Sequence, residues 1–384
     1  PSHRSGKDNK LLRISKFSMP RTAGFSLVEI MVGLAIGMLA VIVILQVFAL
    51  SEGRKRTTTS GGDAQSSGAL MIYQLQRDIG QAGYGFAASS MFNCSVTWPV
   101  ASGGSIATAV PLAPVTINPA TTIIPAGDIN TDRLLIIFGN GNGQPQGNTI
   151  NAQASAVYTV QMPTSFTAGA AGVGDQVIAG PTPPVACGAL IFDRITAVAA
   201  NTVTVATGAT GTTLYNLGPT PTVRAYAVRG GNLTMCDYML NDCGLDANKD
   251  NPSMWVPIAS NIISMKAQYA RDTTAIMDAI PDVFDQTTPT AGCEWVRASA
   301  IRLAIVARSS QYEKTLVTTT AINVGSPVNA PTWEGNSGAP LVAATGYLGP
   351  NAAIDEPWKH YRYKVSQTLV PIRNVVWMGV PTGC

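Results

Sequence analysis

The strongest pattern along the chain is one long apolar run near the N-terminus, from Ile30 to Leu50. It is 21 residues long and contains no Lys, Arg, Asp, Glu or Pro. A helix of this length spans about 30 Å, the thickness of the hydrocarbon core of a bilayer. Glu29 directly precedes the run, and a carboxylate at bilayer depth costs about 2.5–3.5 kcal/mol, less near the interface. The pattern therefore predicts a transmembrane helix whose glutamate finds a partner elsewhere.

Beyond Leu50 the spacing of apolar residues predicts that the helix continues, with an interruption, to Gly83. The segment 57–62 consists of threonine, serine and glycine, which are weak helix formers. Helical spacing then resumes, and five apolar residues fall near one face: Leu70, Ile72, Leu75, Ile79 and Ala82. Because a one-sided apolar face normally packs on a globular domain, we expect residues 51–83 to form an amphipathic, interrupted helix.

From Phe86 to Cys384 the pattern changes to short runs rich in Val, Ile, Tyr and Thr, which predict β-strands. The candidate strands are Leu134–Phe138, Ala156–Gln161, Ala189–Val198, Thr202–Ala206, Val223–Val228, Ile262–Ala270, Ile301–Arg308 and Tyr361–Val370. The Ala/Thr/Gly/Pro tracts Ala101–Ala126 and Thr164–Pro184 suggest low-complexity surface loops. We therefore predict an α+β chain: a leader (1–24), a helix (25–83, with 25–50 transmembrane) and a large β-rich head (84–384).

The residues around Glu29 carry a family resemblance. The hexapeptide Gly24-Phe25-Ser26-Leu27-Val28-Glu29, placed directly before a membrane-length helix, resembles the type III signal of type IV pilins and pseudopilins. The resemblance implies that a prepilin peptidase cuts between Gly24 and Phe25 and that Phe25 is then N-methylated. It also implies that Glu29 pairs with the N-terminal amine of a neighbouring subunit. The alternative is an ordinary signal anchor that contains a glutamate by chance.

Segments at both ends of the chain are similar to one branch of this family, the PilW-type minor pilins. The similar segments are Arg77–Gly85, Asn261–Thr274, Ala298–Ser309 and Trp358–Trp377. The middle of the chain, about 90–255, is not covered by this resemblance. The implied fold is that of a pilin, with a long N-terminal helix and a β-rich head.

The charge before the apolar run orients the predicted helix. The leader contains six basic residues and one acidic residue, which places it in the cytoplasm and the head outside. Met19 begins a compact leader, Met19–Gly24, and we expect it to be the true start. Because the whole chain carries +3, removing residues 1–24 leaves a mature chain of about −2, which gives no reason to expect a nucleic acid partner.

All six cysteines lie in the predicted exported region, where an oxidising compartment favours disulfides. Cys236 and Cys243 are close enough in sequence to close one local loop. For the remaining four we predict Cys293–Cys384 and Cys94–Cys187, although six cysteines allow 15 pairings. A zinc site is the alternative, but the chain has no Cys-x-x-Cys spacing.

Few other motifs suggest chemistry. Asp246, Asn248 and Asp250 have the spacing that begins a calcium loop, but the expected glycine and glutamate are missing, so we predict a polar turn and no metal. The segment 334–341 resembles the nucleophile loop of chymotrypsin-like proteases, with Ser337 in the place of the nucleophile. The only histidine in the predicted exported region, His360, follows this serine, whereas the catalytic histidine of those proteases precedes it. We therefore predict no enzyme and no cofactor. Gly33 and Gly37 form a G-x-x-x-G pattern that permits close helix packing, although they could be merely tolerated.

The resemblance implies a structural function. We expect a minor pilin that primes or caps a type IV pilus and is held first in the bacterial inner membrane. Its partners would be the prepilin peptidase, other minor and major pilins, and the pilus assembly platform. The alternatives are a minor pseudopilin of a type II secretion system, resembling GspJ, and an adhesin or ligand-binding module on a pilin stalk.

Overall fold

The computed structural model describes residues 24–86, 88–97, 108–169, 174–180, 190–318, 331–336, 357–376 and 378. Within α1 the side chains of residues 56, 57 and 60 are not described. The chain divides into two compact units, Pro1–Thr57 and Thr58–Cys384. An N-terminal apolar helix is followed by a β-rich region, which confirms the predicted α+β class.

Helix α1 runs without a break from Leu27 to Gln81, a length of 55 residues. The predicted interruption at 57–62 is therefore wrong. Each weak helix former there costs less than about 1 kcal/mol, and a helix already formed on both sides propagates through them cooperatively. The two-unit boundary does fall at this segment, between Thr57 and Thr58. The helix ends at Gln81, two residues before the predicted Gly83, which has a left-handed φ of 81°.

The head contains four β-structures in the described residues. A three-stranded sheet has the order β2 (Val110–Pro111), β1 (Ser95–Thr97), β8 (Leu190–Ile191). A five-stranded sheet has the order β14 (Val256–Ser260), β13 (Asn232–Asp237), β12 (Thr222–Arg229), β4 (Leu134–Phe138), β3 (Val115–Ile117). A four-stranded sheet has the order β16 (Val283–Asp285), β15 (Ile262–Arg271), β17 (Ala298–Arg308), β18 (Tyr363–Pro371).

The fourth structure is a closed barrel with its own hydrophobic core. Its strands follow the order β10 (Thr202–Val205), β6 (Val157–Val160), β5 (Asn148–Ala154), β11 (Thr213–Gly218), β7 (Gln176–Gly180), β9 (Asp193–Ala199). Tyr158, Ile195, Val203 and Leu214 lie in this core, separate from the main core of the head. The buried carboxylate of Asp193 accepts backbone hydrogen bonds from residues 194 and 206–208, which ties β9 to the turn after β10.

Short helices complete the described elements. These are α2 (Gly292–Arg297), α3 (Arg373–Val376) and the 3₁₀ turns Ser89–Met91, Pro163–Ser165, Asp246–Asn248, Glu334–Asn336 and Pro357–His360. Asn374 in α3 donates hydrogen bonds to the carbonyls of Gln81 and Ala82, so α3 lies beside the end of α1.

Two tracts predicted as surface loops contain buried strands. Val110, Leu112 and Val115 are fully buried, and β7 is buried at every position. These short strands escape prediction because their alanine, glycine and threonine neighbours give little local strand signal, and their pairing with distant strands decides the outcome.

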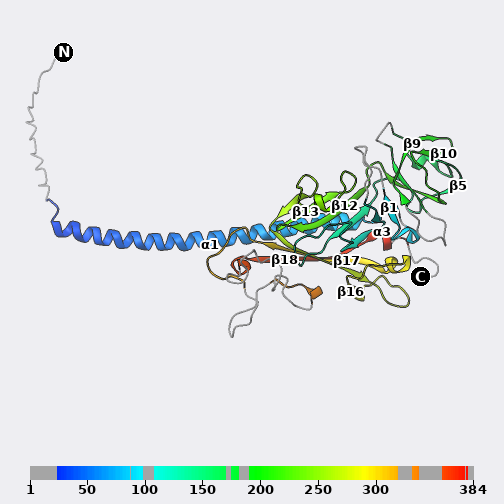
Figure 1. Ribbon diagram of the computed structural model, residues 1–384. Helices are drawn as coiled ribbons and strands as arrows, with labels where there is room; N and C mark the ends of the chain where they lie inside the picture. Colours follow the sequence, from blue (N-terminus) through cyan, green and yellow to red (C-terminus); the bar gives the residue numbers. More distant parts are fainter. Residues whose placement is uncertain are drawn as a thin grey trace, which may run out of the picture. The chain divides into compact units, whose positions relative to one another are not determined.

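The last turns of α1 pack between two sheets (Figure 1). Leu75, Ile79 and Ala82 are fully buried in the main core, whereas Leu70 is 61% exposed, contrary to its predicted place on the packed face. Gln76 donates to the Thr368 hydroxyl of β18 at 2.8 Å. The amphipathic reading of this half of the helix is otherwise consistent with the structure.

A buried carboxylate fixes α1 to the five-stranded sheet. Asp78 has no exposed surface, and its Oδ2 accepts from Arg224 Nη1 at 3.0 Å and from the Tyr226 hydroxyl. Burial raises the pKa of Tyr226, and the nearby charge of Asp78 raises it further, so this hydroxyl stays a donor. The other carboxylate oxygen of Asp78, Oδ1, lies 3.9 Å from Nε of the exposed Arg77.

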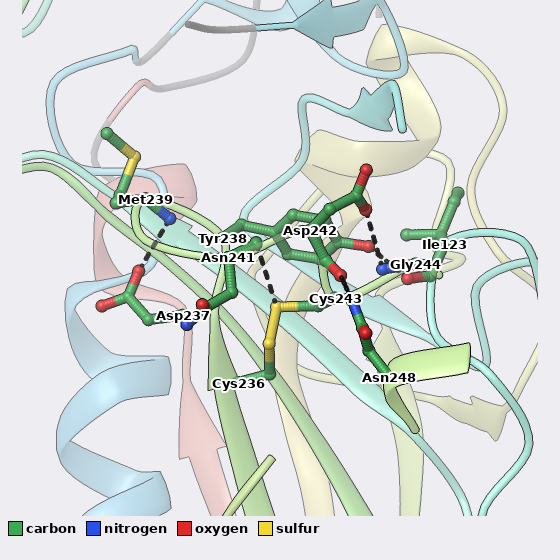
Figure 2. Close-up of a disulfide and its surroundings, with 10 residues drawn as sticks. All are labelled: Ile123, Cys236, Asp237, Tyr238, Met239, Asn241, Asp242, Cys243, Gly244 and Asn248. Atoms are coloured by element: carbon green, nitrogen blue, oxygen red, sulfur yellow. Dashed lines mark hydrogen bonds between the residues drawn. A yellow bond between two sulfur atoms is a disulfide. The ribbon is translucent and has the colours of Figure 1, made fainter. Parts of the chain in front are cut away.

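The predicted local disulfide, Cys236–Cys243, is present (Figure 2). Inside its loop the Tyr238 hydroxyl donates to the carbonyl of Ile123, and Asp237 accepts from the Met239 amide at 2.9 Å. Cys94 and Cys293 are also disulfide-bonded. The predicted pairings Cys94–Cys187 and Cys293–Cys384 fall outside the described residues, because each includes a cysteine that is not described.

We predict that Asp78→Ala lowers the free energy of unfolding of the head by about 3–5 kcal/mol, because it leaves the half-buried guanidinium of Arg224 and the buried hydroxyl of Tyr226 without their acceptor. Arg77→Ala is the control, since Arg77 is 60% exposed in the same helical turn, and we expect a change within about 0.5 kcal/mol. Denaturant unfolding of detergent-solubilised protein measures both. Equal effects of the two substitutions would contradict the anchoring role of Asp78.

We predict that replacing Cys236 and Cys243 together by serine costs about 2–3 kcal/mol, since the open loop gains conformational entropy when the head unfolds. Leu240→Ala, at a 64% exposed position of the same loop, should leave the unfolding free energy within about 0.5 kcal/mol. The same denaturant experiment without reductant applies. A stable double-serine variant would show that the hydrogen bonds in the loop hold it without the disulfide.

Candidate functional site on the N-terminal helix

The candidate cleavage bond, Gly24–Phe25, lies just outside helix α1. Residues Gly24 to Ser26 are not helical, and the first backbone bond of the helix runs from the Ile30 amide to the Ser26 carbonyl at 3.1 Å. Phe25 is 79% exposed. The backbone of this bond is therefore not committed to the hydrogen-bond ladder of the helix, and a peptidase can bind it in an extended form.

Gly24 has no structural need to be glycine within its own chain. A Cβ built on Gly24 meets no atom within 4 Å, and its φ is not left-handed. A requirement for a small residue at this position would therefore come from another molecule. This agrees with a cleavage site that a peptidase reads.

The first turn of α1 carries Glu29 at a position with no described partner. No described cationic side chain forms an ion pair with it. Every described residue from Gly24 to Leu50 is exposed. A carboxylate at the start of such a helix is available for a contact with another chain.

Gly33 and Gly37 follow Glu29 at intervals of four residues, which places the three near one another along the same side of α1. An added Cβ meets no atom within 4 Å at either glycine. Each glycine costs the helix about 1 kcal/mol relative to alanine. No contact within the described part of the chain offsets this cost. Close approach of a second helix therefore explains the two glycines better than packing inside the chain does.

Segment Leu27–Lys55 of α1 is long and apolar enough to cross a membrane. None of its most apolar window is buried inside the protein. The core helix of a soluble domain would, by contrast, be mostly buried. At about 1.5 Å per residue, the 29 residues of Leu27–Lys55 exceed the thickness of a hydrocarbon core.

The other candidate sites gain no support. The Asp246 carboxylate is 3.2 Å from Nζ of Lys249, and the described residues contain no group of three or more His, Cys, Asp or Glu side chains placed to hold a metal ion. His360 is 8% exposed, stacks on the ring of Tyr312 and has its Nδ1 2.6 Å from the carbonyl oxygen of Glu313. Ser337, the serine of the protease-like segment, lies outside the described residues.

Sequence reasoning missed the buried ion pair of Asp78. A signal for it was available, since Asp78 lies between Leu75 and Ile79 on the apolar side of the helix. A carboxylate at such a position is stable only with a partner. The partner itself, on β12, could not be identified from sequence spacing.

Two family models match the chain. Residues 19–45 match the prokaryotic N-terminal methylation motif, and residues 226–374 match the type IV pilus-assembly protein W (PilW) family. These two matches support a type IV pilin-like protein. No curated protein and no solved structure matches it.

The matched regions correspond to definite parts of the structure. The motif covers the candidate cleavage segment and the first part of α1, and the PilW region covers all of the four-stranded sheet together with β13, β14 and the second half of β12. The predicted resemblance to both is confirmed. The PilW match begins at Tyr226, so the uncovered middle of the chain is shorter than the predicted 90–255.

We predict that the mature protein begins at Phe25 with an N-methylated amine, which mass analysis of the native protein would detect. Gly24→Ala should accumulate as the uncleaved form, because the peptidase site has little room for a side chain there. An intact leader on protein recovered from filaments would contradict this prediction.

The structure supplies a matched control. An alanine at Gly53 also meets no atom within 4 Å, so Gly53→Ala introduces the same methyl group in the same open surroundings. We expect normal cleavage of this variant. A defect in Gly24→Ala alone then reports recognition by the peptidase and not a disturbed helix.

Proposed function

We propose that this protein is a minor pilin of the type IV pilus, with a structural role: it primes or caps filament assembly together with other minor pilins. The observation that carries this proposal is Glu29, an acidic residue at the start of the exposed apolar part of α1, four residues after the predicted new N-terminus. A carboxylate in this position needs a cation as soon as it leaves water and headgroups.

The cation follows from the cleavage. In the full-length chain the nitrogen of Phe25 is a peptide nitrogen without charge. Cutting after Gly24 converts it to an amine, which is protonated at neutral pH. The amine of one subunit can then pair with Glu29 of its neighbour when both helices are buried in the filament. Cleavage and assembly are thereby chemically coupled.

The chain would wait in the bacterial inner membrane before assembly. The basic leader supports a cytoplasmic N-terminus, and the head with its disulfides would lie outside, in an oxidising compartment. Near the cytoplasmic interface Glu29 remains solvated, so the single chain is stable there. Its partners in this scheme are the prepilin peptidase, the assembly platform, and other minor and major pilins.

A minor pseudopilin of a type II secretion system, resembling GspJ, would use the same leader and helix. Mass spectrometry of sheared pili separates the two possibilities, because a pseudopilin would be absent from pili made by the same cell. Absence from the pilus fraction, with the protein retained in the membrane, would overturn the pilus proposal.

The closed barrel favours a second candidate function, an adhesin or ligand-binding module. Residues 148–218 lie outside both matched regions. They contain only three charged residues, and two of these, Asp175 and Asp193, are buried. Binding by such an uncharged surface would persist at high salt. Testing the whole head against surfaces and glycans at low and high salt would examine this function.

We predict that Glu29→Gln inserts in the membrane, is cleaved and folds its head, but enters pili poorly. Removing one partner from a desolvated ion pair costs about 3–5 kcal/mol, which is enough to exclude most subunits. Glu29→Asp should be intermediate, because it keeps the charge and shortens the reach. Quantitative immunoblots of sheared pili and membranes give the distribution.

Glu52→Gln is the control, because it makes the same change in the same helix outside the predicted filament contact. We expect it to enter pili at the wild-type level. Wild-type incorporation of Glu29→Gln has two explanations, a subunit at the extreme tip whose own Glu29 is unused, or an incorrect pairing scheme. A pull-down of partner pilins distinguishes them, since a tip subunit retains its partners through the head.

A further inference from the structure

The loop between β15 and β16, residues 272–282, presents large apolar side chains to solvent. Ile276 is 87% exposed and Ile280 is 63% exposed, and Val283, the first residue of β16, is 37% exposed. Four residues beside the isoleucines are also apolar: Ala275, Met277, Ala279 and Pro281. Single exposed apolar residues are ordinary, but several in one short loop mark a contact surface.

The loop is held in one conformation by a buried carboxylate. Asp272 is 1% exposed and accepts from the amides of Thr274, Asp278 and Ala279 at 2.7–3.0 Å, and from the Thr274 hydroxyl at 2.5 Å. Burial acts to raise the pKa of Asp272, but the bonds from Thr274, Ala279 and Asp278 outweigh it and lower the pKa. The carboxylate therefore stays ionised as an acceptor.

A second set of bonds fixes the loop from outside. Arg297, at the end of α2, donates from Nη1 to the carbonyls of Thr274 and Asp272 at 2.7 and 3.2 Å. A loop ordered in this way loses little conformational entropy when it binds. The same bonds prevent Ile276 and Ile280 from folding back onto the head.

The loop lies beside a cavity at the end of the head where α1 ends. The cavity has a volume of about 240 Å³. Its apolar lining is Met277 and Ala279 from the loop, Val296 from α2 and Val376 from α3, and its polar lining is Asp272, Asp278, Arg297 and Ser299. Helix α3 bonds the last residues of α1 through Asn374. The exposed isoleucines and this cavity together form what we call the β15–β16 loop surface.

The charge around this surface is acidic. Asp278 and Asp282 are exposed and accept backbone hydrogen bonds, and no described cationic side chain forms an ion pair with either. A second copy of the chain would bring two acidic borders together, which is unfavourable. A complementary partner carries Lys or Arg around an apolar pocket.

We propose that the β15–β16 loop surface is the contact through which the head binds a neighbouring protein of the pilus, one that offers an apolar pocket bordered by Lys or Arg. The proposal rests on the proposed function, which supplies neighbours for the head. The preformed loop inserts Ile276 and Ile280 into that pocket, and Asp278 and Asp282 pair with its basic border.

Site-specific photo-crosslinking in piliated cells tests the contact. Benzoylphenylalanine is placed in the full chain at position 276, at position 280 and, as a control, at position 129, where Ile129 is 64% exposed. After irradiation, pili are sheared and adducts are identified by mass spectrometry. We expect positions 276 and 280 to give an adduct with a pilus protein, at a peptide rich in apolar residues with a Lys or Arg, and position 129 not to give it.

Charged substitutions provide the second measurement. Ile276→Asp combined with Ile280→Asp should lower the amount of the chain in pili about tenfold or more, because two buried isoleucines are lost from the contact. Ile129→Asp replaces the same residue type at nearly the same exposure as Ile280 and should have no effect. Leader cleavage and the Cys236–Cys243 disulfide should form normally in all variants, which shows that each inserts and folds.

The outcomes separate this inference from the function on which it rests. If the chain is cleaved and present in pili but positions 276 and 280 give no adduct, or an adduct only with a second copy, the inference is wrong and the pilin function stands. Wild-type incorporation of the double aspartate variant also overturns it. If the chain is absent from pili, the proposed function fails, and the inference fails with it.

Discussion

The burial of Asp78 between α1 and β12 is the constraint on which the packing of the head depends. A carboxylate without exposed surface is stable only where its donors are, so the position of Arg224 and Tyr226 fixes both the rotation and the height of the last turns of α1. Apolar side chains alone would allow the helix to slide or turn between the two sheets at small cost. The directional bonds of one charged group select a single placement.

The N-terminal part of the same helix, in contrast, is not packed against any other described part of its own chain. Its apolar side chains are exposed, its glycines have open space around them, and its glutamate has no described partner. None of these features stabilises the single chain. The apolar side chains become favourable when lipid surrounds the segment, and the glycines and the glutamate become favourable only in contact with other chains, which is the reason to regard this part of the protein as a surface for contacts outside its own chain.

The closed barrel and the four-stranded sheet of the PilW region bury their strands in different ways. The barrel pairs every one of its strands on both sides and encloses a small core of its own, so it leaves no sheet edge to protect. The four-stranded sheet of the PilW region uses one face for the main core and covers the other with Trp333 over Ile263, Ala304 and Val306. The barrel therefore has a core of its own and lies outside the region that matches the PilW family.

The sequence alone determined the N-terminal helix, the motif before it and the resemblance of the strands β15, β17 and β18, because these signals are local: a composition, a spacing, or an alternation within ten residues. Only the tertiary structure decided that α1 continues through 57–62, that the tract around Val115 and the strand β7 are buried, that the barrel closes, and that Asp78 meets Arg224. All of these except the continuity of α1 depend on partners far apart in the chain. Cooperative helix propagation and strand pairing outweigh weak local propensities, so residue spacing within a short segment cannot reveal them.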